Sequence, residues 1–298
     1  MINPPIFKII FFGTPKYAQP TLEFLLQEKN YQIIGCVTQP DKPVGRKQII
    51  SPSPIKKFAL EKKLPIYQPT TLKIQKENGK KIYQTLLNLK PDLAIVVAYG
   101  KIIPKEILAI PKYGCLNLHG SLLPQLRGAS PMQQAILAGL PKSGVTLMLM
   151  DEGLDTGDII AQEFLTLSNT ETLTSLHDKL SRLNVKILKD KLPQFIQGKL
   201  KPQKQNTAQA SYTKIIKKTD GEINWQQKPI MIDRQIRALN PWPGTYTFCH
   251  RQRLKILKAH LENNKLLIEQ VQPEGKKIMS YQDFLQGHPQ CQLPPASS

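Results

Sequence analysis

The chain has 298 residues, 40% of them hydrophobic, which suits one large or two ordinary folded domains and excludes a disordered tail. Lys and Arg number 41 against 22 Asp and Glu, for a net charge of +19. This excess indicates a polyanionic partner, either nucleic acid or an anionic membrane face, although a genome that favours lysine codons would also produce it. Per residue, the basic excess is larger after residue 200.

Cysteine and histidine positions give no sign of a metal centre or a disulfide framework. The four cysteines are scattered without a C-x-x-C pair, and no histidine lies at metal-ligand spacing. The first apolar run is too short for a signal peptide, Lys8 interrupts it, and no stretch reaches membrane-spanning length. We expect a soluble monomer without metal in a reducing compartment, either cytoplasmic or, in a eukaryote, an organellar (plastid stroma-like) one.

The first 200 residues predict strands that alternate with helices. Strands are expected over 6–12, 33–38, 65–67, 92–98, 115–119 and 145–150. Helices are expected over 18–26, 55–61, 73–89 and 131–138. The run 92–98 is almost wholly apolar, which is typical of a central parallel strand buried on both faces. The alternation predicts a doubly wound, Rossmann-like α/β domain over residues 1–200 with a mostly parallel sheet.

The pattern changes after residue 200. Residues 201–211 are polar and interrupted by proline, which predicts a linker. Residues 212–298 contain a short helical pattern near 229–239 and alternating runs such as 245–249. We therefore expect a small, separate β-rich domain at this end.

Gly13-Thr14-Pro15 stands where a dinucleotide-binding domain has its phosphate loop. The segment has no second or third glycine, and Pro15 lacks a backbone donor. Binding of NAD or FAD is therefore not expected.

Polar side chains gather near the ends of two predicted strands. Asn117 and His119 share a face of the strand 115–119, because side chains alternate along a strand. At the carboxyl end of a parallel strand they would face the crevice where open α/β sheets bind ligands. Asp155 follows the strand 145–150, in the run D-E-G-L-D-T-G-D.

An amide, an imidazole and a carboxylate, with no Ser or Cys nucleophile beside them, suggest direct acyl transfer to an amine. Asn117 and protonated His119 would stabilise a tetrahedral oxyanion, while Asp155 would orient the imidazole and help to move a proton. Each residue also has a purely structural interpretation: a hydrogen-bonded core histidine, a turn-capping asparagine and an aspartate in an ordinary turn. The spacing alone does not decide between the two.

The chain resembles the 10-formyltetrahydrofolate-dependent formyltransferases in two runs, N-L-H-G-S-L-L-P-Q-L-R-G-A-S-P and G-V-T-L-M-L-M-D-E-G-L-D-T-G-D-I. Further runs resemble the methionyl-tRNA branch of that family: F-F-G-T-P, V-T-Q-P-D-K-P-V-G-R, P-S-P-I-K, V-V-A-Y-G-K-I-I-P and N-P-W-P. The motifs occur in order over almost the whole chain. The resemblance implies that Asn117, His119 and Asp155 are catalytic. It also implies a folate site lined by Ser121, Leu122, Leu123 and Pro124.

The activity implied by the resemblance is transfer of the formyl group of 10-formyltetrahydrofolate to the α-amino group of methionyl initiator tRNA. The product would be N-formylmethionyl-tRNA, used in translation initiation. Two alternatives stay open. One is a formyltransferase acting on a small amine, such as a sugar nucleotide or a purine precursor. The other is an RNA-binding relic without catalytic activity.

The same resemblance assigns tRNA contacts. The basic segment 39–51, which has no helical or strand periodicity, would reach the acceptor end of the tRNA through Arg46. Lys42 and Lys47 would add phosphate contacts, and Gly45 would permit a sharp bend. The family has a C-terminal OB-like β-barrel that holds tRNA. Because this chain offers fewer strands there, we expect a shortened barrel with exposed edges.

Overall fold

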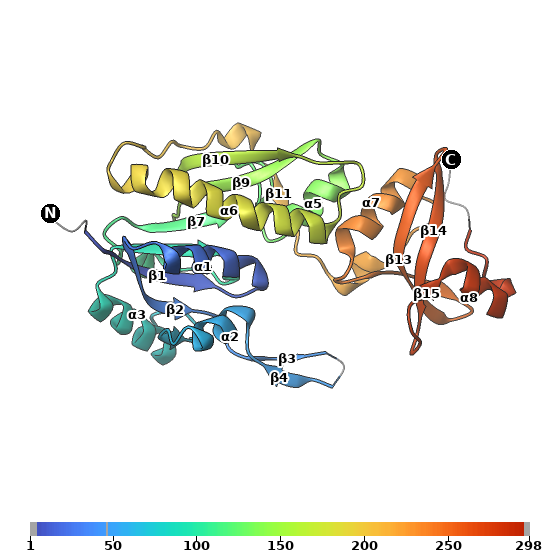
Figure 1. Ribbon diagram of the computed structural model, residues 1–298, viewed down its shortest axis with the longest axis horizontal. Coiled ribbons are helices and arrows are strands. Elements are labelled where there is room, and N and C mark those ends of the chain that lie inside the picture. Colours follow the sequence, from blue (N-terminus) through green and yellow to red (C-terminus); the bar gives the residue numbers. More distant parts are fainter. Residues whose placement is uncertain (1–4, 46, 295–298) are drawn as a thin grey trace. The chain divides into compact units, whose positions relative to one another are not determined.

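The computed structural model describes residues 5–45 and 47–294 of the chain (Figure 1). Residue contacts divide the chain into two units. The first comprises Met1–Arg127, Gly144–Phe164 and Asp178–Tyr212, and the second comprises Gly128–Ser143, Leu165–His177 and Thr213–Ser298. Among the described residues, no helix is both long and apolar enough to span a lipid bilayer.

A seven-stranded sheet in the order β10-β9-β7-β6-β1-β2-β5 forms the centre of the first unit. Its strands are β1 (Phe7–Gly13), β2 (Tyr31–Val37), β5 (Ile66–Tyr67), β6 (Leu93–Val97), β7 (Cys115–His119), β9 (Lys142–Leu149) and β10 (Ile159–Thr166). Parallel pairing joins β1 to β2 and β6, β2 to β5, and β6 to β7. The expected Rossmann-like, mostly parallel sheet is confirmed, but β9 runs antiparallel to β7.

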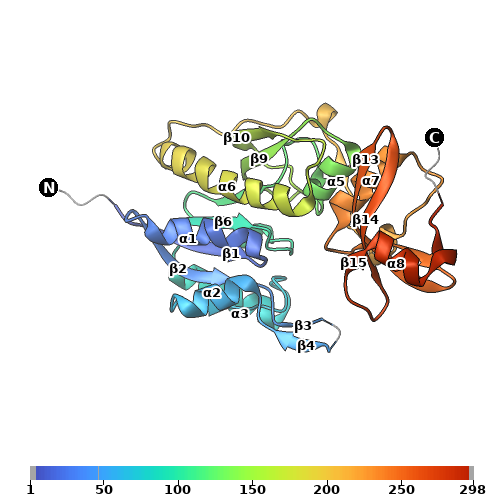
Figure 2. The same ribbon diagram turned by 45° about the vertical axis from the view of Figure 1, so that its right-hand side comes forward.

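Helices cover the sheet (Figures 1 and 2). They are α1 (Gln19–Gln27), α2 (Pro54–Glu61), α3 (Glu77–Leu89), α4 (Lys105–Leu108) and α6 (Leu173–Ile196), with a 3-10 turn, η1 (Lys16–Ala18), before α1. On β1, Ile10 and Phe12 belong to a core cluster with residues of α3 and α4. Ile9 and Phe11 point to the opposite face, and all four are at most 1% exposed. Burial on both faces explains the apolar run Ile9–Phe12 of this strand.

The basic segment forms a hairpin instead of the irregular loop that its lack of periodicity indicated. β3 (Lys42–Val44) pairs antiparallel with β4 (Ile49–Ser51), and Figure 1 shows the pair standing away from the sheet. Gly45 has φ +74° and Gln48 has φ +50°, and the Gln48 amide donates to the Gly45 carbonyl over 3.3 Å. The bend expected at Gly45 therefore uses the left-handed conformation that glycine favours. Strands of three residues are too short to show an alternation in sequence.

The second unit contains an antiparallel sheet in the order β12-β13-β14-β15. Its strands are β12 (Thr245–Cys249), β13 (Gln252–Glu262), β14 (Lys265–Pro273) and β15 (Met279–Ser280). Among the residues the structure describes, this sheet has open edges at β12 and β15, which agrees with the expected shortened barrel and its exposed edges. The edge at β12 is partly covered, because the Ile223 amide donates to the Tyr246 carbonyl over 2.8 Å.

Helices α7 (Pro229–Leu239) and α8 (Tyr281–Gly287) pack against this sheet, and α5 (Pro131–Ala138) packs against α7. Ile232 and Ile236 of α7 share a buried cluster with Leu254 and Ile256 of β13 and with Phe284 of α8. The remaining short segments are β8 (Arg127–Gly128), β11 (Tyr212–Thr213), η2 (Thr207–Gln209), η3 (Lys218–Gly221) and η4 (Pro289–Cys291).

Cys249 and Cys291 are joined by a disulfide, whereas the sequence predicted none, so that prediction is wrong. The two residues are 42 positions apart in sequence and belong to no spacing motif. Only the folding of β12 and the segment after α8 brings their Cα atoms to 5.6 Å. Cys36 and Cys115 are free and buried.

Candidate active site

Asn117 and His119 lie on the same face of β7 as Cys115, whose side chain packs into the cluster formed with α3 and α4. Asn117 is 9% exposed and His119 is 6% exposed. Burial raises the pKa of the Cys115 thiol to about 12. This thiol is therefore protonated at neutral pH and a poor nucleophile, which leaves an amide and an imidazole as the reactive polar groups on this face of β7.

The His119 ring has an oxygen atom near each nitrogen. Nε2 lies 3.0 Å from the Leu126 carbonyl oxygen, and Nδ1 lies 3.5 Å from Oδ2 of Asp155. Leu126 has φ +57°, an unusual value for a bulky residue, and its amide donates to Ser211 Oγ over 2.9 Å. Either ring nitrogen can donate to the oxygen beside it when that nitrogen carries a proton. The two oxygens therefore help to set the orientation of the ring.

Asp155 does not follow the carboxyl end of a strand parallel to β7. It lies in the loop that follows the antiparallel strand β9. Because β9 is antiparallel to β7, Leu149 at its end pairs with Leu116 near the start of β7. Asp155 therefore belongs to the loop 150–158 between β9 and β10. It has φ +53°, a conformation that aspartate tolerates better than most residues. Gly157 lies so close to the Leu149 carbonyl that a Cβ atom would stand 1.9 Å from that oxygen.

Gln205 holds this loop in place through hydrogen bonds, a role that no sequence motif indicated. Its Nε2 donates to the carbonyls of Asp155, over 2.9 Å, and Gly157, over 2.7 Å. Its Oε1 accepts from Arg127 Nη2 over 2.7 Å and from Arg127 Nε over 3.1 Å. Arg127 is 1% exposed and also donates to the Tyr212 hydroxyl over 3.1 Å. Arg127 occurs in the R-G-A-S-P run of the motif, whereas Gln205 lies in the polar segment predicted to be a linker.

The Asn117 side chain is buried without using its hydrogen-bonding capacity inside the protein. Within residues 5–45 and 47–294, its amide makes no side-chain hydrogen bond. The amide atoms are not among the fully enclosed side-chain polar atoms that lack a partner, so they keep contact with solvent. The two N–H donors of the amide are therefore available to a molecule that enters from solvent.

The predicted folate segment is held rigidly to the sheet. Thr146 of β9 donates its hydroxyl to the Ser121 carbonyl over 2.7 Å and accepts from the Leu123 amide over 3.0 Å. Gln162 of β10 donates to Thr146 Oγ1 and to the Leu123 carbonyl, over 2.9 and 2.8 Å.

The segment Ser121–Pro124 contains two buried and two half-buried side chains. Ser121 and Leu123 are 1% and 3% exposed, and the Ser121 hydroxyl is used internally, donating to the Gln125 carbonyl over 2.6 Å. Leu122 and Pro124 are half-buried. Solvent therefore reaches the side chains of Leu122 and Pro124, whereas those of Ser121 and Leu123 are enclosed.

Two of the three predicted tRNA-binding residues, Lys42 and Lys47, belong to the hairpin segment. Lys42 and Lys47 are exposed, and Arg46 lies outside the described residues. Asp41, at the base of the hairpin, pairs with Lys56 over 2.6 Å, and this hydrogen bond lowers the pKa of its carboxyl group. The Asp41 carboxylate is thus already paired, so it opposes phosphate binding less than a free carboxylate would.

Comparison with known proteins identifies the family. The model of the formyl transferase family matches residues 7–192, and that of the formyl transferase C-terminal domain matches residues 215–266. The methionyl-tRNA formyltransferase of Caldanaerobacter subterraneus subsp. tengcongensis is 40% identical over 304 aligned residues, covering 94% of this chain and 97% of that protein.

Solved structures show the same fold. The methionyl-tRNA formyltransferase from Clostridium thermocellum matches with a TM-score of 0.61 and 22% identity, over 90% of this chain and 99% of that one. A sugar 3N-formyl transferase, solved in the presence of dTDP and 5-N-formyl-THF, matches with a TM-score of 0.64 and 24% identity, over 92% of this chain and 97% of that one. On the family models and the 40% identity together, the chain belongs to the formyl transferase family.

Proposed function

We propose that this protein transfers the formyl group of 10-formyltetrahydrofolate to the α-amino group of methionyl initiator tRNA. The observation that carries the proposal is the buried group formed by the unpaired Asn117 amide and by His119, which lies 3.5 Å from Asp155. The choice of substrate is supported by relatives about 40% identical over nearly the full chain, which are methionyl-tRNA formyltransferases.

The three side chains suit a direct transfer in which no enzyme-bound acyl group forms. The amine nitrogen attacks the formyl carbon, and the carbonyl oxygen gains negative charge as the new C–N bond forms. Asn117 N–H donates to that oxygen, and the positive charge of protonated His119 beside it stabilises the developing negative charge. Collapse of the tetrahedral species breaks the bond to N10 of the folate, and the proton lost by the amine goes to the folate nitrogen. Asp155 orients His119 and assists this proton movement.

Binding of the two substrates is assigned to separate surfaces. We assign the folate to the segment Ser121–Pro124, where Leu122 and Pro124 offer partly exposed apolar contacts. The β3–β4 hairpin, through Lys42 and Lys47, contacts tRNA phosphates. Each lysine acts as a point charge. The dependence of log K on log salt grows with the number of phosphates neutralised, and such contacts carry no base specificity.

The test is formylation of charged initiator tRNA by the purified protein with 10-formyltetrahydrofolate as donor. We expect formylmethionyl-tRNA from initiator tRNA, less from elongator methionyl-tRNA, and no inhibition by an amino-sugar nucleotide. His119→Ala should abolish the activity. His260→Gln is the matched control, because His260 is an exposed histidine paired with Glu269 in the C-terminal domain. Product formation at the His119→Ala level by the unmodified chain would end the proposal.

A further inference from the structure

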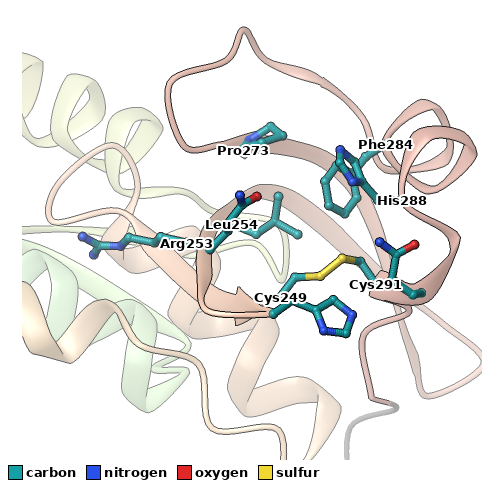
Figure 3. A pocket seen from close by; sticks show the side chains of 10 residues that line it. Cys249, Arg253, Leu254, Pro273, Phe284, His288 and Cys291 are labelled. Carbon is teal, nitrogen blue, oxygen red and sulfur yellow. A yellow bond between two sulfur atoms is a disulfide. The ribbon is translucent and has the colours of Figure 1, made fainter.

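A second cluster of reactive side chains lies in the C-terminal domain, where the family resemblance assigns no chemistry. Cys249 ends β12 and Cys291 ends η4, and Figure 3 shows their sulfur atoms joined beside His288 and Phe284. Cys291 is 6% exposed, and Cys249 is half-buried. The pair lines a pocket of about 350 Å³.

His250 adds a nitrogen ligand to the two sulfurs. Because Cys249 pairs with Gln252, His250 and Arg251 form the two-residue turn between β12 and β13. They have φ +44° and +69°, the positive values of a type I′ turn, for which Asn and Gly are the usual residues. The side-chain ligand atoms of Cys249, His250 and Cys291 all lie within 4.8 Å of one another. His250 is exposed, so solvent reaches this side of the cluster.

Two sulfurs and one imidazole nitrogen make a ligand set suited to Zn²⁺, which binds thiolate sulfur at about 2.3 Å and histidine nitrogen at about 2.0–2.1 Å in a tetrahedron. A tetrahedron of those dimensions has ligand–ligand edges of about 3.3–3.8 Å. The three ligand atoms already lie within 4.8 Å of one another. Once the disulfide is broken, small side-chain movements would therefore bring them to the distances of a tetrahedral zinc site.

We propose that Cys249, Cys291 and His250 bind Zn²⁺ when the cysteine pair is reduced. Two molecules of a thiol reductant reduce the disulfide: the S–S bond accepts two electrons and two protons, and the reductant becomes its own disulfide. Zn²⁺ then displaces both thiol protons, neutral His250 supplies the third ligand, and water from the open side takes the fourth position.

The site has a structural consequence for the end of the chain. Cys291 and Phe284 of α8 share the buried cluster with Leu254 of β13. The disulfide in the oxidised protein and the metal in the reduced protein therefore link the same two segments. Either link holds α8 and η4 to β12, so the C-terminal domain keeps this connection in both redox states.

The test uses the full chain, reduced with a phosphine and exchanged into metal-free buffer. We expect the reduced protein to bind about one Zn²⁺ per chain with release of about two protons, and to show a thiolate-to-cobalt charge-transfer band with Co²⁺. The disulfide form should bind neither ion. Zn²⁺ should also raise the melting temperature of the reduced chain, because it binds the folded state.

Variants identify the ligands. Cys249→Ser and Cys291→Ser should lose the charge-transfer band, and His250→Gln should weaken Zn²⁺ binding by roughly tenfold or more. His260→Gln, an equivalent change at another exposed histidine of the domain, should bind as the unmodified chain does. His250 is in an exposed turn, so its variant stays folded even if the cysteine variants do not. The proposal fails if the reduced, unmodified chain shows no thiolate-to-cobalt band. It also fails if the reduced His250→Gln variant binds Zn²⁺ as tightly as the reduced, unmodified chain.

Discussion

Replacement of Gln205 tests whether the Asp155 loop must be held in place for catalysis. Gln205→Ala removes two hydrogen bonds to the carbonyls of Asp155 and Gly157 and two from the buried Arg127 guanidinium. Neutral bonds contribute about 1 kcal/mol each and bonds to a charged group about 1.5–3 kcal/mol. Counting the bidentate Arg127 contact once, the free energy of unfolding of this domain should fall by about 3.5–5 kcal/mol. A loop displaced by about 1 Å should lower kcat by roughly 10²-fold, with a smaller change in KM for tRNA.

A second variant separates stability from positioning. Gln205→Glu keeps an oxygen acceptor for Arg127 but removes both donors to the loop, so it should unfold at a higher urea concentration than Gln205→Ala and still show the lowered kcat. Gln203→Ala is the matched control, because Gln203 is exposed and pairs with Ile159 only through its backbone. Steady-state formylation with urea unfolding measures both quantities. A kcat at the unmodified level in Gln205→Glu, or an equal loss in Gln203→Ala, would refute the positioning role.

Three further changes probe the site, the hairpin and the buried thiols. Asp155→Asn should lower kcat by about 10²–10⁴-fold, because it removes the carboxylate that orients the histidine and assists proton transfer, while tRNA binding in a filter assay stays unchanged. The double change Lys42→Ala with Lys47→Ala should weaken tRNA binding and reduce the slope of log K against log salt by about 1.5, with folate affinity unaltered; an unchanged slope would contradict the phosphate contacts. Burial raises the pKa of Cys36 and of Cys115 to about 12, so neither thiol should react with an aromatic disulfide reagent at pH 8 until the chain is unfolded in urea; rapid labelling of the native protein would contradict their burial.

The elements that the sequence predicted well are those whose pattern is local. The apolar run at 92–98 and the alternation in Cys115–His119 correspond to β6 and β7, and alternation alone places Asn117 and His119 on one face. The D-T-G-D motif brought Asp155 into the candidate site, and the structure sets it 3.5 Å from His119.

What the sequence did not show depends on contacts between distant residues. A strand pattern carries no direction, so nothing in residues 142–149 indicated that β9 runs antiparallel. Gln205 occurs among polar residues of ordinary linker composition. Only its hydrogen bonds to the carbonyls of Gly157 and Asp155, 48 and 50 positions earlier, distinguish it from the neighbouring polar residues. The pairing of Cys249 with Cys291 likewise depends on how the C-terminal segment returns to β12.

Thr146 pairs in register with His119 across β7 and β9, and the same side chain fastens Ser121 and Leu123. One buried threonine thus sets both the backbone opposite the imidazole and the shape of the segment assigned to the pterin donor. The segment Ser121–Pro124 already has its folded conformation before the folate donor binds. Binding therefore costs little conformational entropy, and more of the interaction energy contributes to affinity.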